Sequence, residues 1–131
     1  MMMPRTDRRP KLALLVWPLT AAYWLGIFYL THLPPERLPK TRITDVHAHF
    51  TAYAVLALLL LWSLHYTELS PRAAAWWVVG LCLFYGALDE VLQIPVGRTC
   101  SMKDWIADAS GTVTVVAVAV VIGAAWHVRR A

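Results

Sequence analysis

Four long apolar runs divide this chain and leave it few ways to fold. A helix that crosses a lipid bilayer needs about 20 predominantly apolar residues, and runs of about that length cover residues 12–31, 49–66, 72–93 and 103–127. Only 15% of the 131 residues are charged and 59% are hydrophobic, whereas a soluble domain carries about 25% charged residues. The sequence therefore predicts a single all-α domain: a small integral membrane protein with four transmembrane helices.

Other classes of protein are disfavoured by the same features. The first run follows a basic segment, as in a signal peptide, but it is longer than an h-region of about 7–15 residues, and no small-residue cleavage site follows it. The net charge of +4 comes from short basic groups at hydrophobic boundaries, so nucleic-acid binding is not expected. Cys82 and Cys100 are predicted to be free, and no Cys/His spacing matches a zinc site.

The distribution of lysine and arginine predicts the orientation. Four passes place both termini on one side, together with the loop near Ser70. That side holds seven basic residues, namely Arg5, Arg8, Arg9, Lys11, Arg72, Arg129 and Arg130. The other side holds five, namely Arg37, Lys40, Arg42, Arg98 and Lys103. Because cytoplasmic segments carry the excess of basic residues and the first helix usually dominates, both termini are predicted to be cytoplasmic, with segments 32–48 and 94–103 facing outward.

Polar residues gather near the outward ends of the predicted helices. They form three groups: Asp45, His47, His49 and Tyr53; Asp89, Glu90 and Gln93; and Arg98, Ser101, Asp104 and Asp108. Carboxylates within a membrane segment are costly unless they are compensated, so this constellation is expected to carry the function. Adjacent residues point about 100° apart on a helix, so one of Asp89 and Glu90 is expected to face the cluster and the other a neighbouring helix or the interface. Gly111 continues the helical face of Asp104 and Asp108, where a glycine permits close approach of another helix.

Several of these residues also have a structural interpretation. Ser101 is a suitable N-cap for the fourth helix, and Asp104 is a first-turn acid favoured by the helix dipole. Arg98 can neutralise Glu90 or Asp104 as readily as it can bind a ligand. Two residues are predicted to lie in the loop without a chemical role: Asp45 and His47.

Two kinds of chemistry fit the whole set. Glu90, Asp108 and His49 could act as catalytic acid and base on a phosphate or acyl substrate held by Arg98. The same oxygen-rich groups could coordinate a hard cation such as Mg²⁺ or Ca²⁺, although no residue is assigned as a metal ligand from the sequence. A binding site without catalysis needs only Arg98 and a few hydrogen-bond partners. The expected ligand-binding residues are Arg98, Gln93, Tyr53, Asp89, Ser101 and Asp104.

These residues resemble the signature of the VanZ-like family. The matching string reads His49-Phe50-x-x-Tyr53-x-x-Leu56, then Asp89-Glu90-x-x-Gln93, then Gly97-Arg98-x-x-Ser101-x-x-Asp104-x-x-x-Asp108-x-x-Gly111. The resemblance covers about residues 45–111 and the first apolar run. It implies a small helical membrane protein and a link to glycopeptide antibiotic resistance, since the family is named for a protein associated with teicoplanin resistance. It implies no particular biochemical activity.

The chain departs from the family pattern at two positions. Val46 stands where the family commonly has a lysine, and Val115 stands where a second glycine often follows the one matching Gly111. Any role of that lysine would have to be taken by Lys40 or Arg42 from the preceding loop.

Together, the residues and the resemblance predict a bacterial inner-membrane protein. Its outward-facing pocket is expected to bind an anionic cell-envelope component, either a lipid-linked cell-wall precursor or a phospholipid headgroup, through Arg98. The first alternative is an intramembrane acid/base or metal-assisted hydrolase or transferase that acts on a lipid headgroup. The second is a structural bundle whose charges neutralise one another. The expected partners are thus the bilayer and an anionic lipid, and the sequence identifies no cofactor and no oligomeric state.

Overall fold

Four long helices make up the protein. The computed structural model describes residues 9–38 and 44–128, and within these ranges all regular structure is helical. The long helices are α1 (Arg9–Thr31), α2 (Asp45–Leu64), α3 (Pro71–Leu92) and α4 (Met102–Val128), with short 3₁₀ helices η1 (Pro35–Arg37) and η2 (Ile94–Val96) in the connections. All four long helices are long and apolar enough to cross a membrane. The prediction of a small all-α, multi-pass membrane protein is confirmed.

The boundaries of α3 and α4 agree with the predicted ones to within one residue, α1 begins three residues earlier than predicted, and α2 differs most. This helix begins four residues earlier than predicted because the Thr44 side chain caps it, accepting a hydrogen bond from the backbone N–H of His47 at 3.4 Å. Asp45 and His47 therefore lie in the first turn of α2, and their assignment to the loop was wrong. At its other end α2 stops at Leu64 and a turn follows, so Tyr66 lies outside the helix.

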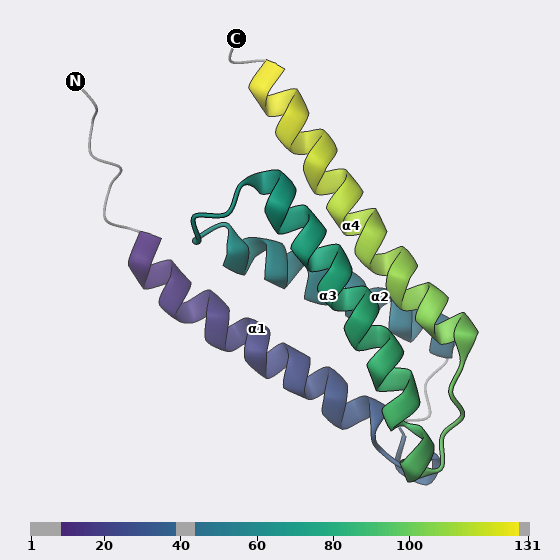
Figure 1. The fold of residues 1–131 in the computed structure, drawn as a ribbon. Helices are drawn as coiled ribbons and strands as arrows, with labels where there is room; N and C mark the ends of the chain where they lie inside the picture. Colours follow the sequence, from purple (N-terminus) through teal and green to yellow (C-terminus); the bar gives the residue numbers. More distant parts are fainter. Residues whose placement is uncertain (1–8, 39–43, 129–131) are drawn as a thin grey trace, which may run out of the picture.

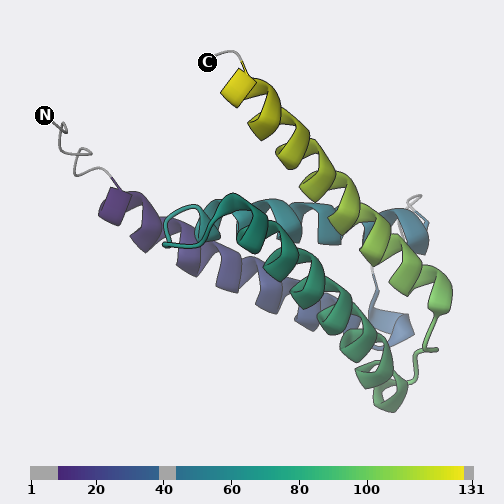
Figure 2. The ribbon, with the colours of Figure 1, turned by 45° about the horizontal axis from the view of Figure 1, so that its top comes forward.

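The helices alternate in direction, so their ends gather at two opposite ends of the molecule (Figures 1 and 2). One end holds the beginning of α1, the turn between α2 and α3, and the end of α4. The other end holds η1, η2 and the beginnings of α2 and α4, where the three polar groups lie. Several basic residues used to predict the orientation lie outside the described residues, namely Arg5, Arg8, Lys40, Arg42, Arg129 and Arg130.

A compact apolar core holds the helices together. It includes Tyr53 and Leu56 of α2, Val78 and Cys82 of α3, and Ile27 of α1. Large apolar side chains such as Leu14, Trp76 and Phe84 are exposed on the outside, as expected of surfaces that face lipid. Cys82 is buried, Cys100 is exposed, and both are free, as predicted.

Gly111 allows α2 and α4 to touch along their backbones. A Cβ atom added at Gly111 would overlap the carbonyl oxygen of Phe50 and lie 3.1 Å from the backbone nitrogen of Ala54. The predicted role of this glycine in close helix approach is therefore confirmed. The contact also brings together His49, one residue before Phe50 on α2, and Asp108, three residues before Gly111 on α4.

Candidate functional site

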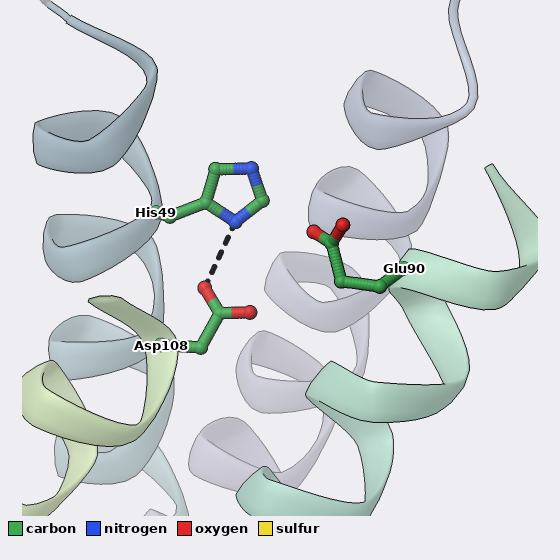
Figure 3. Close-up of side chains that lie close together, drawn as sticks. All are labelled: His49, Glu90 and Asp108. Carbon is green, nitrogen blue, oxygen red and sulfur yellow. Dashed lines mark hydrogen bonds and ion pairs between the residues drawn. The ribbon is translucent and has the colours of Figure 1, made fainter. Parts of the chain in front are cut away.

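His49, Glu90 and Asp108 converge from three different helices at the polar end of the bundle (Figure 3). The Nδ1 atom of His49 lies 2.9 Å from Oδ1 of Asp108, which accepts its hydrogen bond. Glu90 faces this pair from α3, and one ligating atom from each residue lies within 4.8 Å of the other two. The three residues are 6%, 3% and 1% exposed, respectively. The structure thus joins the three residues for which the sequence suggested acid/base roles.

The carboxylate of Glu90 is held in place by two donors. The backbone N–H of Ser101 donates to Oε2 at 2.6 Å, and the Gln93 side-chain amide donates to Oε1 at 3.3 Å. The Ser101 hydroxyl accepts from the backbone N–H of Asp104 at 3.3 Å, which confirms Ser101 as the N-cap of α4. Ser101 therefore has two roles, and only the capping role was predictable from the sequence.

Asp89 is also buried, but it points toward α1 rather than toward His49. The hydroxyl of Thr31 donates to its Oδ1 at 2.9 Å, and the Nδ1 atom of His32 lies 3.8 Å from the same oxygen. Gln93 donates to Oδ2 at 3.3 Å and Tyr85 to Oδ1 at 3.4 Å. The expected divergence of the two neighbouring carboxylates is confirmed, with Gln93 bridging them.

Three partners of Asp89 were missing from the sequence interpretation. Tyr85 precedes Asp89 by four residues, so helical spacing could have identified it. Thr31 is the last residue of α1, and His32 follows it. Thr31 lies 58 residues before Asp89 in the sequence, and no local pattern connects either residue to Asp89.

Arg98 pairs with a residue that the sequence had left without a role. Its guanidinium lies 3.6 Å from the carboxylate of Asp45; within the described ranges, it forms no ion pair with Glu90 or Asp104. Gly97, which ends η2 with φ at 81°, provides the left-handed turn that directs the chain to Arg98. The structural alternative, in which Arg98 neutralises Glu90 or Asp104, was wrong, because Asp45 at the start of α2 lies closer to the guanidinium.

A cavity of about 500 Å³ opens between α1 and α2 beside these groups. Much of the cavity lining is apolar and rich in small residues. The polar part of the lining includes Arg98, Asp45 and His49. The remaining lining residues are Ala22, Tyr23, Gly26, Ile27, Leu30, Thr31, Leu38, Ala48, Ala52 and Tyr53. His49 therefore borders the cavity and also bonds to buried Asp108. The contribution of α1 to this cavity was not predicted: its small residues four apart, Ala22 and Gly26, are typical of a close helix contact, but a Cβ atom added at Gly26 would meet nothing within 4 Å.

Four buried polar atoms have no hydrogen-bond partner among the described residues. They are the hydroxyls of Tyr53 and Thr112, the Oδ2 atom of Asp108 and the Nε2 atom of His32. Leaving a buried polar atom without a partner costs about 1–3 kcal/mol, and more when the group is charged. Such atoms are therefore expected to contact a ligand, an ion or water.

The predicted ligand-binding residues do not form one surface. Arg98 and Tyr53 line the cavity, whereas Gln93 and Asp89 lie in the buried network behind it. Asp104 is half-buried in the first turn of α4, as predicted for a first-turn acid. Comparisons with protein-family models, with curated proteins and with solved structures gave no match.

Proposed function

We propose that this protein binds the anionic headgroup of a lipid in the cavity between α1 and α2. The observation that carries the proposal is the placement of the Arg98 guanidinium in the lining of a cavity whose other walls are largely apolar. A cavity of about 500 Å³ lies within the usual range for small-molecule sites, about 300–1,000 Å³. The apolar wall suits an acyl chain, and the cation suits the headgroup.

The charge of Arg98 is available to such a ligand. Its partner Asp45 has a side chain that is 64% exposed and lies 3.6 Å away. An ion pair with one exposed member contributes little stability, so a phosphate can replace or share this contact. A guanidinium offers two parallel N–H donors to a phosphate or carboxylate, which favours arginine over lysine at this position.

Small residues make room for the apolar part of the ligand. Ala22 and Gly26 of α1 face Ala48 and Ala52 of α2 across the cavity. Larger side chains at these positions would close the space between the two helices. We therefore expect the acyl chain to lie along these residues, with the headgroup at Arg98.

The proposal also includes the membrane that holds the protein, the orientation of the protein in it, and the class of lipid that it binds. We place the protein in a bacterial inner membrane, with both termini cytoplasmic and the Arg98 end outward, because of the basic residues near the N-terminus. The lipid would then be a phospholipid or a lipid-linked cell-wall precursor of the outer leaflet. A relationship to the VanZ-like family, and with it a link to glycopeptide resistance, stays a prediction that rests on the polar signature.

Native mass spectrometry of the gently purified protein tests lipid binding. Wild-type protein is expected to retain an anionic lipid, Arg98→Ala to lose it, and Arg98→Lys to retain less of it. Lys103→Ala is the matched control, because it removes a positive charge from the same end of the bundle without changing the cavity lining. Equal retention by wild type and Arg98→Ala, or no lipid on the wild type, would refute the proposal. The mass of the retained species distinguishes a phospholipid from a cell-wall precursor.

A second candidate function, catalysis on the bound headgroup, is favoured by the His49–Asp108 pair. Asp108 accepts from Nδ1 of His49, and a carboxylate in this position orients an imidazole so that its Nε2 atom can act as a base. Because His49 also lines the cavity, the ring lies beside the proposed ligand. Turnover of a lipid-linked substrate by wild type, lost in His49→Gln and Glu90→Gln, would support catalysis. Binding without turnover would favour the binding function alone.

A further inference from the structure

We propose that His49, Glu90 and Asp108 form a binding site for a divalent metal ion of the zinc or manganese kind. The proposal does not depend on lipid binding, because it assigns no ligand-binding role to Arg98 or to the apolar wall. It rests on the convergence of three ligating side chains, on an unpartnered carboxylate oxygen, and on the lack of compensating charge around them.

The spacing of the three side chains suits a single ion. Zinc ligands lie about 2.0–2.2 Å from the metal when they are nitrogen or oxygen atoms, so two ligands of one ion are at most about 4.4 Å apart. One ligating atom from each of His49, Glu90 and Asp108 lies within 4.8 Å of the others. Closing this small difference requires side-chain adjustments only, because the three helices already hold the residues together (Figure 3).

Asp108 offers one carboxylate oxygen that accepts no hydrogen bond from the described residues. Its side chain is 1% exposed, and Oδ2 has no hydrogen-bond partner within the part of the chain that the structure describes. The other oxygen, Oδ1, accepts from Nδ1 of His49; an ion bound through Nδ1 would replace the proton of this hydrogen bond, because a ligating imidazole nitrogen is unprotonated and the proton leaves to solvent on binding. A buried carboxylate oxygen without a donor is strongly unfavourable unless a cation or a proton compensates it.

The surrounding charges do not balance the buried carboxylates. Asp89, Glu90 and Asp108 are all at most 3% exposed. Within residues 9–38 and 44–128, the basic side chains within 4.0 Å of any of them are two histidines, His32 near Asp89 and His49 near Asp108, which carry a charge only when protonated, while Arg98 pairs with Asp45. A divalent ion between Glu90 and Asp108 would compensate two negative charges that are otherwise costly to bury.

The donor set selects the kind of ion. Calcium takes six to eight oxygen ligands, more than two carboxylates and an imidazole provide. Magnesium prefers oxygen ligands and retains its water, whereas imidazole nitrogen suits first-row transition metals. A set of one histidine and two carboxylates therefore favours Zn²⁺ or Mn²⁺ and leaves a coordination position open for water or substrate.

The groups around the ligands also fit a metal site. Glu90 is oriented by the Ser101 N–H at 2.6 Å and by the Gln93 amide at 3.3 Å, and such outer contacts typically fix ligands for metal binding. His49 borders the cavity between α1 and α2, which provides a route for the ion to enter.

Metal titration of the detergent-purified protein tests the proposal. The protein is treated with a chelator, exchanged into buffer, and titrated with Zn²⁺ and separately with Mn²⁺. Binding is followed by calorimetry, and metal content is measured by mass spectrometry after desalting. Wild type is expected to bind one ion per chain, and Glu90→Gln and Asp108→Asn are expected to bind at least 10-fold more weakly, as losses of metal ligands or their supports do.

Asp89→Asn is the matched control, because it removes an equally buried carboxylate that points toward α1 instead. This variant is expected to bind metal as wild type does, and so is Arg98→Ala, which separates this test from that of lipid binding. No stoichiometric metal on folded wild-type protein would overturn the proposal and leave protonation as the compensation for Asp108. Equal loss of metal in Asp89→Asn and Asp108→Asn would also overturn it. Circular dichroism of each variant shows that its helices are intact before the titration is interpreted.

Discussion

Replacing Gly111 with alanine is expected to separate α2 from α4 and to disrupt the site that the two helices share. The added methyl group would overlap the backbone carbonyl of Phe50 and lie 3.1 Å from the backbone nitrogen of Ala54. Backbone atoms cannot rotate away as a flexible side chain can, so α2 itself must move. Overpacking of this kind costs about 1–3 kcal/mol, partly offset by the better helix propensity of alanine, worth at most about 1 kcal/mol.

Because the overlap is with backbone atoms, the upper part of this range, about 2–3 kcal/mol, applies. Subtracting the full propensity gain of about 1 kcal/mol leaves a loss of about 1–2 kcal/mol in the free energy of unfolding. Such a loss reduces the ratio of folded to unfolded protein about 5- to 30-fold. It is measured by unfolding the protein in mixed detergent micelles with increasing sodium dodecyl sulfate and following the helical circular dichroism. Gly123→Ala is the control, since a Cβ atom there has nothing within 4 Å and is expected to leave stability unchanged or to raise it slightly.

The same substitution reports on the candidate site. Gly111 lies one helical turn after Asp108, and Phe50 follows His49, so movement of α2 lengthens the His49–Asp108 contact of 2.9 Å. We expect Gly111→Ala to weaken metal binding, and Gly123→Ala to leave it unaltered. If Gly111→Ala proves as stable as Gly123→Ala, the close packing of α2 on α4 is not a source of stability and this reasoning is wrong.

Three further predictions concern other parts of the bundle. A membrane-impermeant maleimide is expected to label exposed Cys100 on the native protein and buried Cys82 only after denaturation; labelling of Cys100 in intact cells would support an outward orientation of this end, and protection there would contradict it. Thr20→Val removes the buried 2.8 Å hydrogen bond to Ser63 between α1 and α2 and is expected to cost about 0.6–1.7 kcal/mol in the same unfolding assay. Thr31→Val removes the 2.9 Å donor to Asp89 and is expected to cost about 1–3 kcal/mol, whereas Thr67→Val, at an exposed turn, should change stability much less.

Part of the site was predictable because its geometry is local. Residues three or four apart share a helical face, which correctly placed Gln93 beside both Asp89 and Glu90. The preference of serine for the N-cap correctly placed Ser101 at the start of α4. The start of α2 was missed because Thr44 caps it within a polar segment, where hydropathy gives no signal.

Other parts of the site depend on which way each helix is turned about its own axis. Asp89 and Glu90 are adjacent in the sequence, yet one contacts Thr31 of α1 and the other Ser101 before α4. Arg98 has several carboxylates nearby along the chain, and the fold brings Asp45, at the start of α2, to 3.6 Å from its guanidinium. Residue spacing does not predict how each helix is rotated relative to its neighbours, and so it could not identify these partners.

Four helices long and apolar enough to cross a membrane, with polar groups gathered at one end, could be predicted from the residues alone. This was possible because the length of an apolar run and the chemistry of helix ends act within a few residues of the chain. The contact of His49 with Asp108 across 59 residues, the addition of Glu90 to the cluster, and the cavity beside it between α1 and α2 arise only when the helices pack. These features arise from the close packing of helices on one another, at Gly111 above all, and packing depends on all four helices at once.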